Sequence, residues 1–176
     1  MLIQTARFGA VQIGEDDILT FTEGILGFNQ LRKFVLLDDP EDEIFAWLQS
    51  CELPDIAFPV LEPDLFATHY KISLTKSELE FLELKSLEGS RSFCIITIPE
   101  DPTLMTANLK APVIINIKTR RARQCVLQDN DLAIREPIFI KLQQKLVHAM
   151  PIRSQAAKAG LAVQLNSEKR APEAQK

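Results

Sequence analysis

One segment of the chain, residues 93–129, constrains the fold more than any other. It is crowded with residues branched at Cβ, which fit a pleated, half-buried surface better than a helix. They are Ile95, Ile96, Ile98, Val113, Ile114, Ile115 and Ile117. Polar breaks at residues 99–105 and 118–123 divide the segment into three predicted strands. In the first break, we expect Asp101 to cap, and Pro102 to begin, one helical turn that ends near Met105.

The remaining elements are predicted from short patterns. Residues 2–8 and 10–13 alternate around Gly9, as in a hairpin, and further strands are expected at residues 18–21, 34–37, 44–50 and 70–74. Gly24 and Gly27 indicate a tight connection. Thr75 and Glu78 have the spacing of a capping box before a short helix that runs to about residue 84. We therefore predict a mainly β fold, a single domain with one or two short helices.

Two features of residues 44–63 leave alternatives open. Trp47 lies in an alternating strand, where it belongs either to the core or to a binding surface. Prolines at positions 54, 59 and 63 remove backbone donors and force residues 53–63 into a sheet edge or a looped path. An edge would accept a strand or helix from a partner, whereas a loop would only cross between sheets.

Composition narrows the class of protein. A chain of 176 residues, 46% hydrophobic and 25% charged, fits one domain with a core of ordinary size. No apolar run is long enough to span a bilayer and the first residues do not resemble a signal peptide, so we expect a cytoplasmic protein without membrane contact. The cysteines at positions 51, 94 and 125 lack the spacing of a zinc site or a disulfide framework and are expected to be reduced.

Charge is distributed unevenly along the chain. Residues 1–139 contain 13 Lys or Arg against 22 Asp or Glu, and residues 140–176 contain 7 against 2. An acidic body of this kind favours basic partners over phosphate backbones. We therefore divide the chain into a body, residues 1–139, and a basic C-terminal extension, residues 140–176. Leu142, Lys145, Leu146 and Met150 share one helical stripe, while the composition after Ser154 predicts a disordered end with little to bury.

The residues do not indicate an enzyme or a metal site. His69 and His148 occur far apart and without a supporting motif. The carboxylates at residues 38–43 lack the spacing of a calcium loop and predict a solvated turn. We expect no cofactor. A basic cluster, Lys118, Arg120, Arg121 and Arg123, is either a solvated hairpin tip or, together with the extension, the surface of a small nucleic-acid-binding β-barrel.

Four blocks, in order, resemble the FliW family of flagellar assembly factors, which are cytosolic protein-binding regulators in bacteria. The first block is LTFTEGILGF at residues 19–28, and the second combines FAWLQS at 45–50 with AFPV at 57–60. The third combines IPEDP at 98–102 with MTANL at 105–109, and the fourth is APVIIN at 111–116. The resemblance covers about residues 2–139. The family usually has Pro at the positions of Thr22 and Leu26, which predicts a looser loop here, and often Gly at the position of Ala122.

The resemblance implies a compact, antiparallel β-barrel-like fold and a non-enzymatic regulator with two protein partners. Family members bind the translational repressor CsrA, relieving its block on flagellin mRNA, and they bind flagellin, which releases CsrA. The same role would make this protein monomeric when free, with no direct contact to nucleic acid. Candidate partner-binding residues are the exposed-looking members of the third block, with a proline-rich edge in the second; a structural role in turns is equally open for each. These candidates are Phe58, Pro59, Glu100, Asp101, Met105, Thr106 and Asn108.

Overall fold

The computed structural model describes residues 1–42, 44–148 and 160–165, with only the backbone described for 146–148. The first half of the chain contains β1 (Leu2–Thr5), β2 (Gly9–Gln12), η1 (Glu15–Asp17), β3 (Leu19–Phe21), β4 (Lys33–Asp38), β5 (Ala46–Ser50), β6 (Ala57–Leu61), η2 (Pro63–Leu65) and α1 (Lys76–Phe81). The second half contains β7 (Ser90–Thr97), η3 (Pro102–Leu104), β8 (Thr106–Ala107), β9 (Val113–Asn116), β10 (Arg121–Gln124), β11 (Glu136–Pro137), α2 (Phe139–His148) and β12 (Val163–Gln164).

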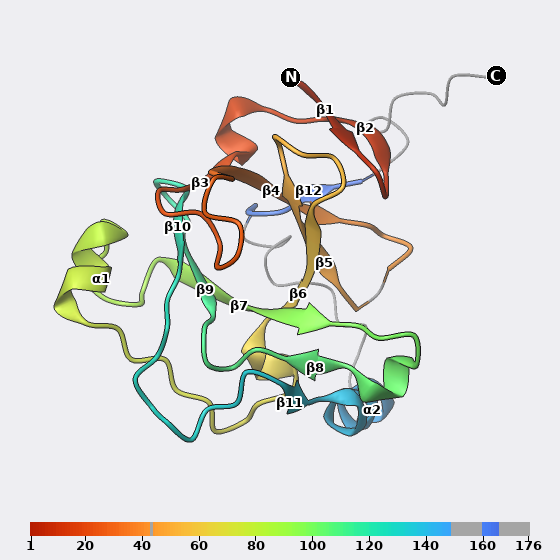
Figure 1. Cartoon of the computed structure of the whole chain (residues 1–176), viewed down its shortest axis with the longest axis vertical. Helices are drawn as coiled ribbons and strands as arrows, with labels where there is room; N and C mark the ends of the chain where they lie inside the picture. The colour runs from red at the N-terminus through yellow and green to blue at the C-terminus, as the bar shows by residue number, and fades with distance from the viewer. Residues whose placement is uncertain (43, 149–159, 166–176) are drawn as a thin grey trace.

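Seven strands close into a barrel (Figure 1), in the order β3, β4, β5, β6, β7, β9 and β10. Neighbours are antiparallel except β3 and β10, which pair in parallel through Thr20 and Arg121. Closure is possible because two strands share one edge of β7. Ser90–Phe93 pair with β9, while Ile96 and Thr97 pair with β8. The predicted mainly β, barrel-like fold is confirmed, and the parallel pair of β3 and β10 is the departure from an antiparallel arrangement within the barrel.

Side chains from all seven strands fill the barrel. This interior cluster includes Leu19, Phe21, Phe34, Leu36, Ala46, Leu48, Val60, Phe93, Val113, Ile115 and Ala122. Because successive side chains on a strand point to opposite faces, the intervening residues of β4, Val35 and Leu37, face outward. They are also buried, since other elements cover the barrel there. Burial on both faces explains why residues 34–37 of β4 and 113–115 of β9 are all apolar.

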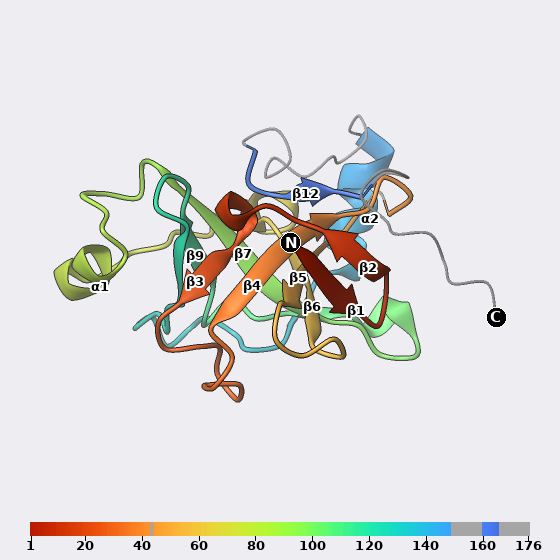
Figure 2. The same cartoon turned by 90° about the horizontal axis from the view of Figure 1, so that it is seen from above.

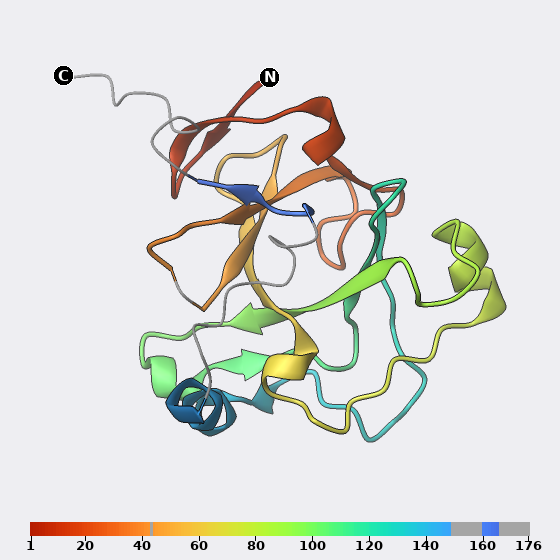
Figure 3. The same ribbon diagram turned by 180° about the vertical axis from the view of Figure 1, so that it is seen from behind.

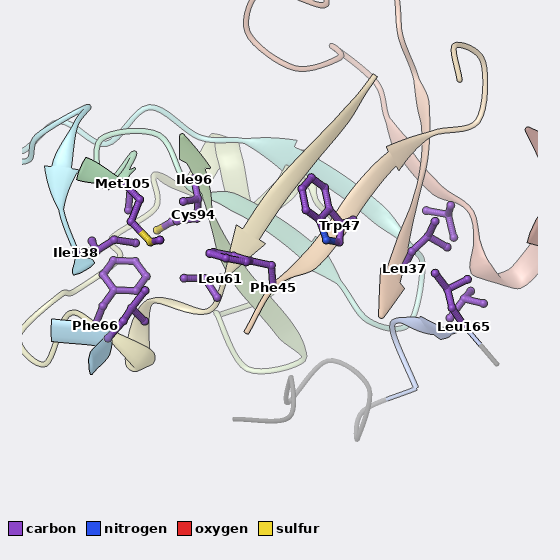
Figure 4. Packing of buried hydrophobic residues seen from close by; sticks show 14 of the residues in the cluster. Leu37, Phe45, Trp47, Leu61, Phe66, Cys94, Ile96, Met105, Ile138 and Leu165 are labelled. Atoms are coloured by element: carbon purple, nitrogen blue, oxygen red, sulfur yellow. The ribbon is translucent and has the colours of Figure 1, made fainter. Parts of the chain in front are cut away.

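The outer cluster is the larger of the two main groups of buried residues (Figure 4). Hairpin β1–β2 contributes Ile3, Val11 and Ile13, and β12 contributes Val163. The segments around β8, β11 and α2 complete it with Met105, Ala107, Leu109, Ile138 and Leu142. Trp47 belongs to this cluster and is only 7% exposed, so it is a core residue. A third cluster, formed by Leu82, Ile114 and Cys125, lies between α1 and the barrel.

Several local predictions are confirmed. Thr75 and Glu78 form the predicted capping box, with Glu78 N–H donating to Thr75 Oγ1 over 3.2 Å and Thr75 N–H donating to Glu78 Oε2 over 3.0 Å. Asp101 caps the predicted turn, η3. Gly24 has a φ of +70°, and a Cβ there would lie 2.7 Å from the carbonyl oxygen of Phe28, so the tight connection requires glycine.

Two predictions about strands were wrong. Residues 70–74 form no strand, although Ile72 and Leu74 alternate onto the third cluster, which explains the strand-like pattern. The proline-rich segment is not an edge throughout, because β6 pairs with β5 on one side and with β7 on the other. The pairing with β7 begins at Val60, directly after Pro59, so the proline lies where that side of β6 has no strand partner.

The C-terminal extension contains more structure than its composition indicated. The predicted helix is present as α2, with Leu142 buried. Beyond it, Leu161, Val163 and Leu165 are each at most 5% exposed, and β12 pairs in parallel with the end of β4 (Figures 1 and 2). The expectation that little packs beyond Ser154 is therefore wrong for residues 160–165. The division at residue 139 stays a prediction, and Met150 lies outside the described residues.

Candidate functional site

The turn between β7 and β8 contains most of the candidate residues. Asp101 Oδ1 accepts hydrogen bonds from the Thr103 hydroxyl (2.6 Å) and the Thr103 N–H (3.0 Å). These bonds, the side-chain one foremost, lower the pKa of Asp101, so its carboxylate is charged at neutral pH. Glu100 is exposed beside it. The turn thus presents two adjacent carboxylates on a backbone fixed by an N-cap.

Exposed apolar side chains occur in this turn and in the helix that packs against it. Leu104, in η3, is 65% exposed, and Ile98, at the start of the turn, is 38% exposed. Helix α2 packs against η3, and its Ile140 is 68% exposed. Large apolar residues at this exposure, next to acidic groups on one end of the molecule, have the composition of a protein interface. We call Ile98, Glu100, Asp101, Leu104 and Ile140 the acidic-apolar surface.

The remaining candidates of the third block have structural roles. Met105 is 6% exposed and packs in the outer cluster near Cys94 and Ile138 (Figure 4), so the expectation that it is exposed was wrong. Consecutive residues of the η3 turn face opposite ways, which places Leu104 outside and Met105 inside. Thr106 pairs with Thr97 within the sheet. Asn108 Oδ1 accepts from the N–H groups of Lys110 and Ala111, both over 3.1 Å.

Phe58 and Pro59 lie apart from that turn, on β6. The Phe58 ring is half-buried and meets the Phe28 ring edge to face, with centroids 5.3 Å apart. Pro59 is half-buried opposite Trp47. The structure therefore does not bring the two sets of candidate residues into one site. The sequence-based candidates did not include the exposed residues Leu104 and Ile140, because the sequence does not show which apolar residues of these segments are exposed.

An open groove lies on the other side of α2, between the helix and the segment that follows η2. It has a volume of about 820 Å³ and is lined by Leu65, Phe66, Ala67, Thr68, His69, Tyr70, Leu109, Leu132, Lys141, Gln144 and Lys145. Figure 3 shows η2 (yellow) and α2 (blue) side by side at this end of the molecule. The Tyr70 hydroxyl donates to the Leu109 carbonyl over 2.6 Å and fixes the wall of the groove opposite α2.

The basic cluster at the β9–β10 hairpin is partly neutralised. Arg121 forms an ion pair with Glu83 at 2.9 Å, and Arg123 forms one with Glu23 at 3.2 Å. The Arg123 guanidinium also lies over the Phe81 ring, 4.3 Å from its centroid. These contacts attach the hairpin to the α1 region and to the loop that contains Glu23. Arg121 and Arg123 therefore have a structural role.

The described residues contain no group of three or more His, Cys, Asp or Glu side chains placed to hold a metal ion. No helix in the described part of the chain is long and apolar enough to cross a membrane. The three cysteines are free, and burial raises the pKa of the Cys94 and Cys125 thiols to about 12. Thiols with such pKa values are poor nucleophiles at neutral pH.

Comparison with known proteins decides the family. A family model described as "FliW protein" matches residues 2–138. The chain belongs to the FliW family. A "Flagellar assembly factor FliW" of Bdellovibrio bacteriovorus is 64% identical over 168 residues, covering 94% of this chain and 96% of that protein. A protein of the same description from Leptospira interrogans is 41% identical over 138 residues, 78% of this chain and 92% of its own.

A crystal structure of the flagellar assembly factor FliW has the same fold. Its TM-score is 0.74 at 32% identity, and the match covers 79% of this chain and 97% of the other. The match to the Bdellovibrio relative extends past residue 139, so part of the extension is shared within the FliW family. The predicted looser loop at the first block is anchored at Leu26, whose N–H donates to Gln124 Oε1 over 2.9 Å. A proline has no N–H and would lack this bond.

Proposed function

We propose that this protein is a flagellar assembly factor that works in the cytoplasm without catalysis. It binds and antagonises the translational repressor CsrA, and it binds flagellin, so that flagellin synthesis follows flagellum assembly. Membership of the FliW family carries this proposal, above all the 64% identity to the Bdellovibrio assembly factor over nearly the whole length of both chains. The free protein is a monomer and contacts no nucleic acid in this role.

The acidic-apolar surface supports the choice of a basic partner. Glu100 and Asp101 lie on a fixed turn in a body whose charge is strongly negative. Charged groups at an interface contribute mainly association rate and specificity, whereas apolar groups provide most of the affinity. We therefore assign steering of CsrA to the two carboxylates and anchoring to Leu104 and Ile140.

The other candidate residues enter the proposal with different roles. Met105 supports the surface from beneath, and Thr106 and Asn108 hold the shape of the turn. Phe58 and Pro59, on β6, form a separate candidate contact. Substituting both Glu100 and Asp101 by Lys is expected to weaken CsrA binding while leaving the body folded, although loss of the Asp101 cap is expected to lower the free energy of unfolding. Glu15→Lys with Asp16→Lys, an exposed acidic pair in η1, is the matched control.

Flagellin acts as a signal in this scheme only if it displaces CsrA. Changing the occupant of a binding site from almost entirely one partner to almost entirely the other requires a difference of about 5.5 kcal/mol in binding free energy. Overlapping footprints supply that difference by steric exclusion. The test is titration of flagellin monomer into a preformed complex with CsrA, followed by size-exclusion chromatography.

Release of CsrA as flagellin binds is the expected result. A ternary complex that persists at saturating flagellin would refute exclusion but leave both partners in place. Failure of the full chain to bind either protein would refute the proposed function. Tight RNA binding by the isolated chain at physiological salt would instead favour a nucleic-acid-binding barrel.

A further inference from the structure

The groove between α2 and the segment after η2 has a composition unlike the rest of the body. Five of its lining residues are apolar: Leu65, Phe66, Ala67, Leu109 and Leu132. Among the described residues that line it, the charged ones are Lys141 and Lys145, and none is a carboxylate. The lysines give this groove positive charge, whereas the body as a whole has a strongly negative charge. The groove therefore selects an occupant with negative charge.

The two lysines are held in place without being strongly neutralised. Lys145 Nζ donates to the Asp64 carbonyl over 2.7 Å, a neutral partner that leaves the charge of the ammonium intact. Lys141 Nζ lies 3.0 Å from Glu136 Oε1, but the two side chains are 49% and 30% exposed. Exposed ion pairs contribute about 0–1 kcal/mol, so a carboxylate from a partner exchanges for Glu136 at little cost.

The spacing of the charges indicates what kind of chain fits. Lys141 and Lys145 are four residues apart on α2, so they lie on one face about 6 Å apart along the axis. A second helix lying along the groove presents carboxylates at the same spacing, with its apolar side chains toward Phe66 and Leu109. The wall opposite α2 is preformed, because the Ala67 N–H donates to the Pro63 carbonyl over 2.8 Å and Tyr70 is bonded to Leu109. A preformed wall lowers the entropic cost of binding.

We propose that this groove docks an amphipathic helix of a protein partner, with apolar residues on one face and carboxylates one turn apart beside them. The groove and the acidic-apolar surface lie on either side of α2, next to η2 and η3 respectively. The chain therefore offers a basic partner and an acidic helix two different surfaces. This inference does not depend on the proposed function, since it follows from the lining of the groove alone.

The test uses two synthetic helices of about 15 residues, the length at which isolated helices become stable. Both place Leu at helical spacing on one face, and one has Glu beside that face where the other has Lys. Binding to the full chain is followed by fluorescence anisotropy at low salt. We expect the acidic helix to bind about tenfold or more tightly than the basic helix, with the preference falling as salt is added.

Charge reversal locates the binding. Lys141→Glu with Lys145→Glu is expected to abolish or invert the preference, and Lys141→Gln with Lys145→Gln, which adds no carboxylate to the groove, is expected to abolish it. Lys85→Glu with Lys118→Glu is the matched control: both lysines are exposed and outside the groove, and the net charge changes equally. The control should retain the preference of the unchanged chain. Far-UV circular dichroism of each variant checks that the fold is intact.

Three results would overturn the proposal. The first is equal affinity for the two helices, or a preference that the groove variants and the control lose alike. The second is displacement of the acidic helix by decanoate at similar affinity, which would assign the groove to a small amphiphile. The third is self-association of the full chain that the groove variants abolish, which would assign it to a second copy.

Discussion

Trp47 is the residue whose replacement tests the barrel packing most directly. It lies on β5, is 7% exposed and packs in the outer cluster. Its Nε1 donates to Asp42 Oδ2 over 3.3 Å, and the Arg7 guanidinium lies 3.6 Å from the ring centroid. Trp47→Ala therefore removes a large buried ring, leaves a cavity, and takes away the surface on which Arg7 rests.

The expected loss follows from these contacts. Replacing a buried Phe or Trp by Ala lowers the free energy of unfolding by about 3–5 kcal/mol. For a domain of this size each kcal/mol lowers the melting temperature by about 2–4 °C, so the expected fall is roughly 6–20 °C. Arg7→Ala removes only an exposed cation–π contact and is expected to cost about 0.5–1 kcal/mol. The double variant should cost less than the two single losses together, since Arg7 has no ring left to cover.

Urea unfolding followed by far-UV circular dichroism is the appropriate measurement, because the substitution removes the only tryptophan of the chain. Leu53→Ala serves as the control: Leu53 is 49% exposed, and its loss should change the free energy of unfolding by about 0.5 kcal/mol or less. A cost below about 1 kcal/mol for Trp47→Ala, with loss of affinity for CsrA, would show that the ring belongs to a binding surface and refute the core assignment.

Three further perturbations test other parts of the fold. Gly24→Ala is expected to cost several times more in unfolding free energy than Gly27→Ala, because both have positive φ but only Gly24 has backbone atoms within 3 Å of the added Cβ; equal melting temperatures would contradict this. Leu161→Ala is expected to cost about 2–3 kcal/mol in thermal unfolding, at the lower end for a buried leucine because its segment is short; no loss would mean that residues 160–165 contribute nothing to stability. The thiols of Cys94 and Cys125 should react with Ellman's reagent at pH 8 only after unfolding, because pKa values of about 12 keep them protonated in the folded chain; rapid labelling without denaturant would contradict their burial.

Features fixed by neighbouring residues were predictable from sequence. The capping box at Thr75 and Glu78 and the Asp101 cap depend on side chains within three residues, so their spacing alone specifies them. The apolar strands of residues 93–116 were also clear, because branched side chains dominate them. The family resemblance supplied the barrel, which no local pattern contains.

Features set by distant contacts were not predictable. Leu104 and Met105 are adjacent apolar residues, and only packing against α2 and the barrel decides which one is buried. Residues 70–74 alternate like a strand because Ile72 and Leu74 pack on the cluster of Leu82, Ile114 and Cys125, yet they pair with no strand in the described part of the chain. Leu161 and Val163 appear isolated in a polar tail, and their burial depends on β4, more than 120 residues earlier in the chain.

The parallel pairing of β3 with β10 determines when the barrel can form during synthesis. Thr20 can pair with Arg121 only after Arg121 has been synthesised, so about two thirds of the chain must be made before the barrel can close. Until then a meander of β4, β5 and β6 has apolar residues on both faces, and β7, β9 and β10 are not yet present to complete the barrel interior. Long-range pairing that occurs late slows folding and leaves aggregation-prone apolar surface exposed during folding. A chain truncated before β10 therefore lacks the strand that closes the ring.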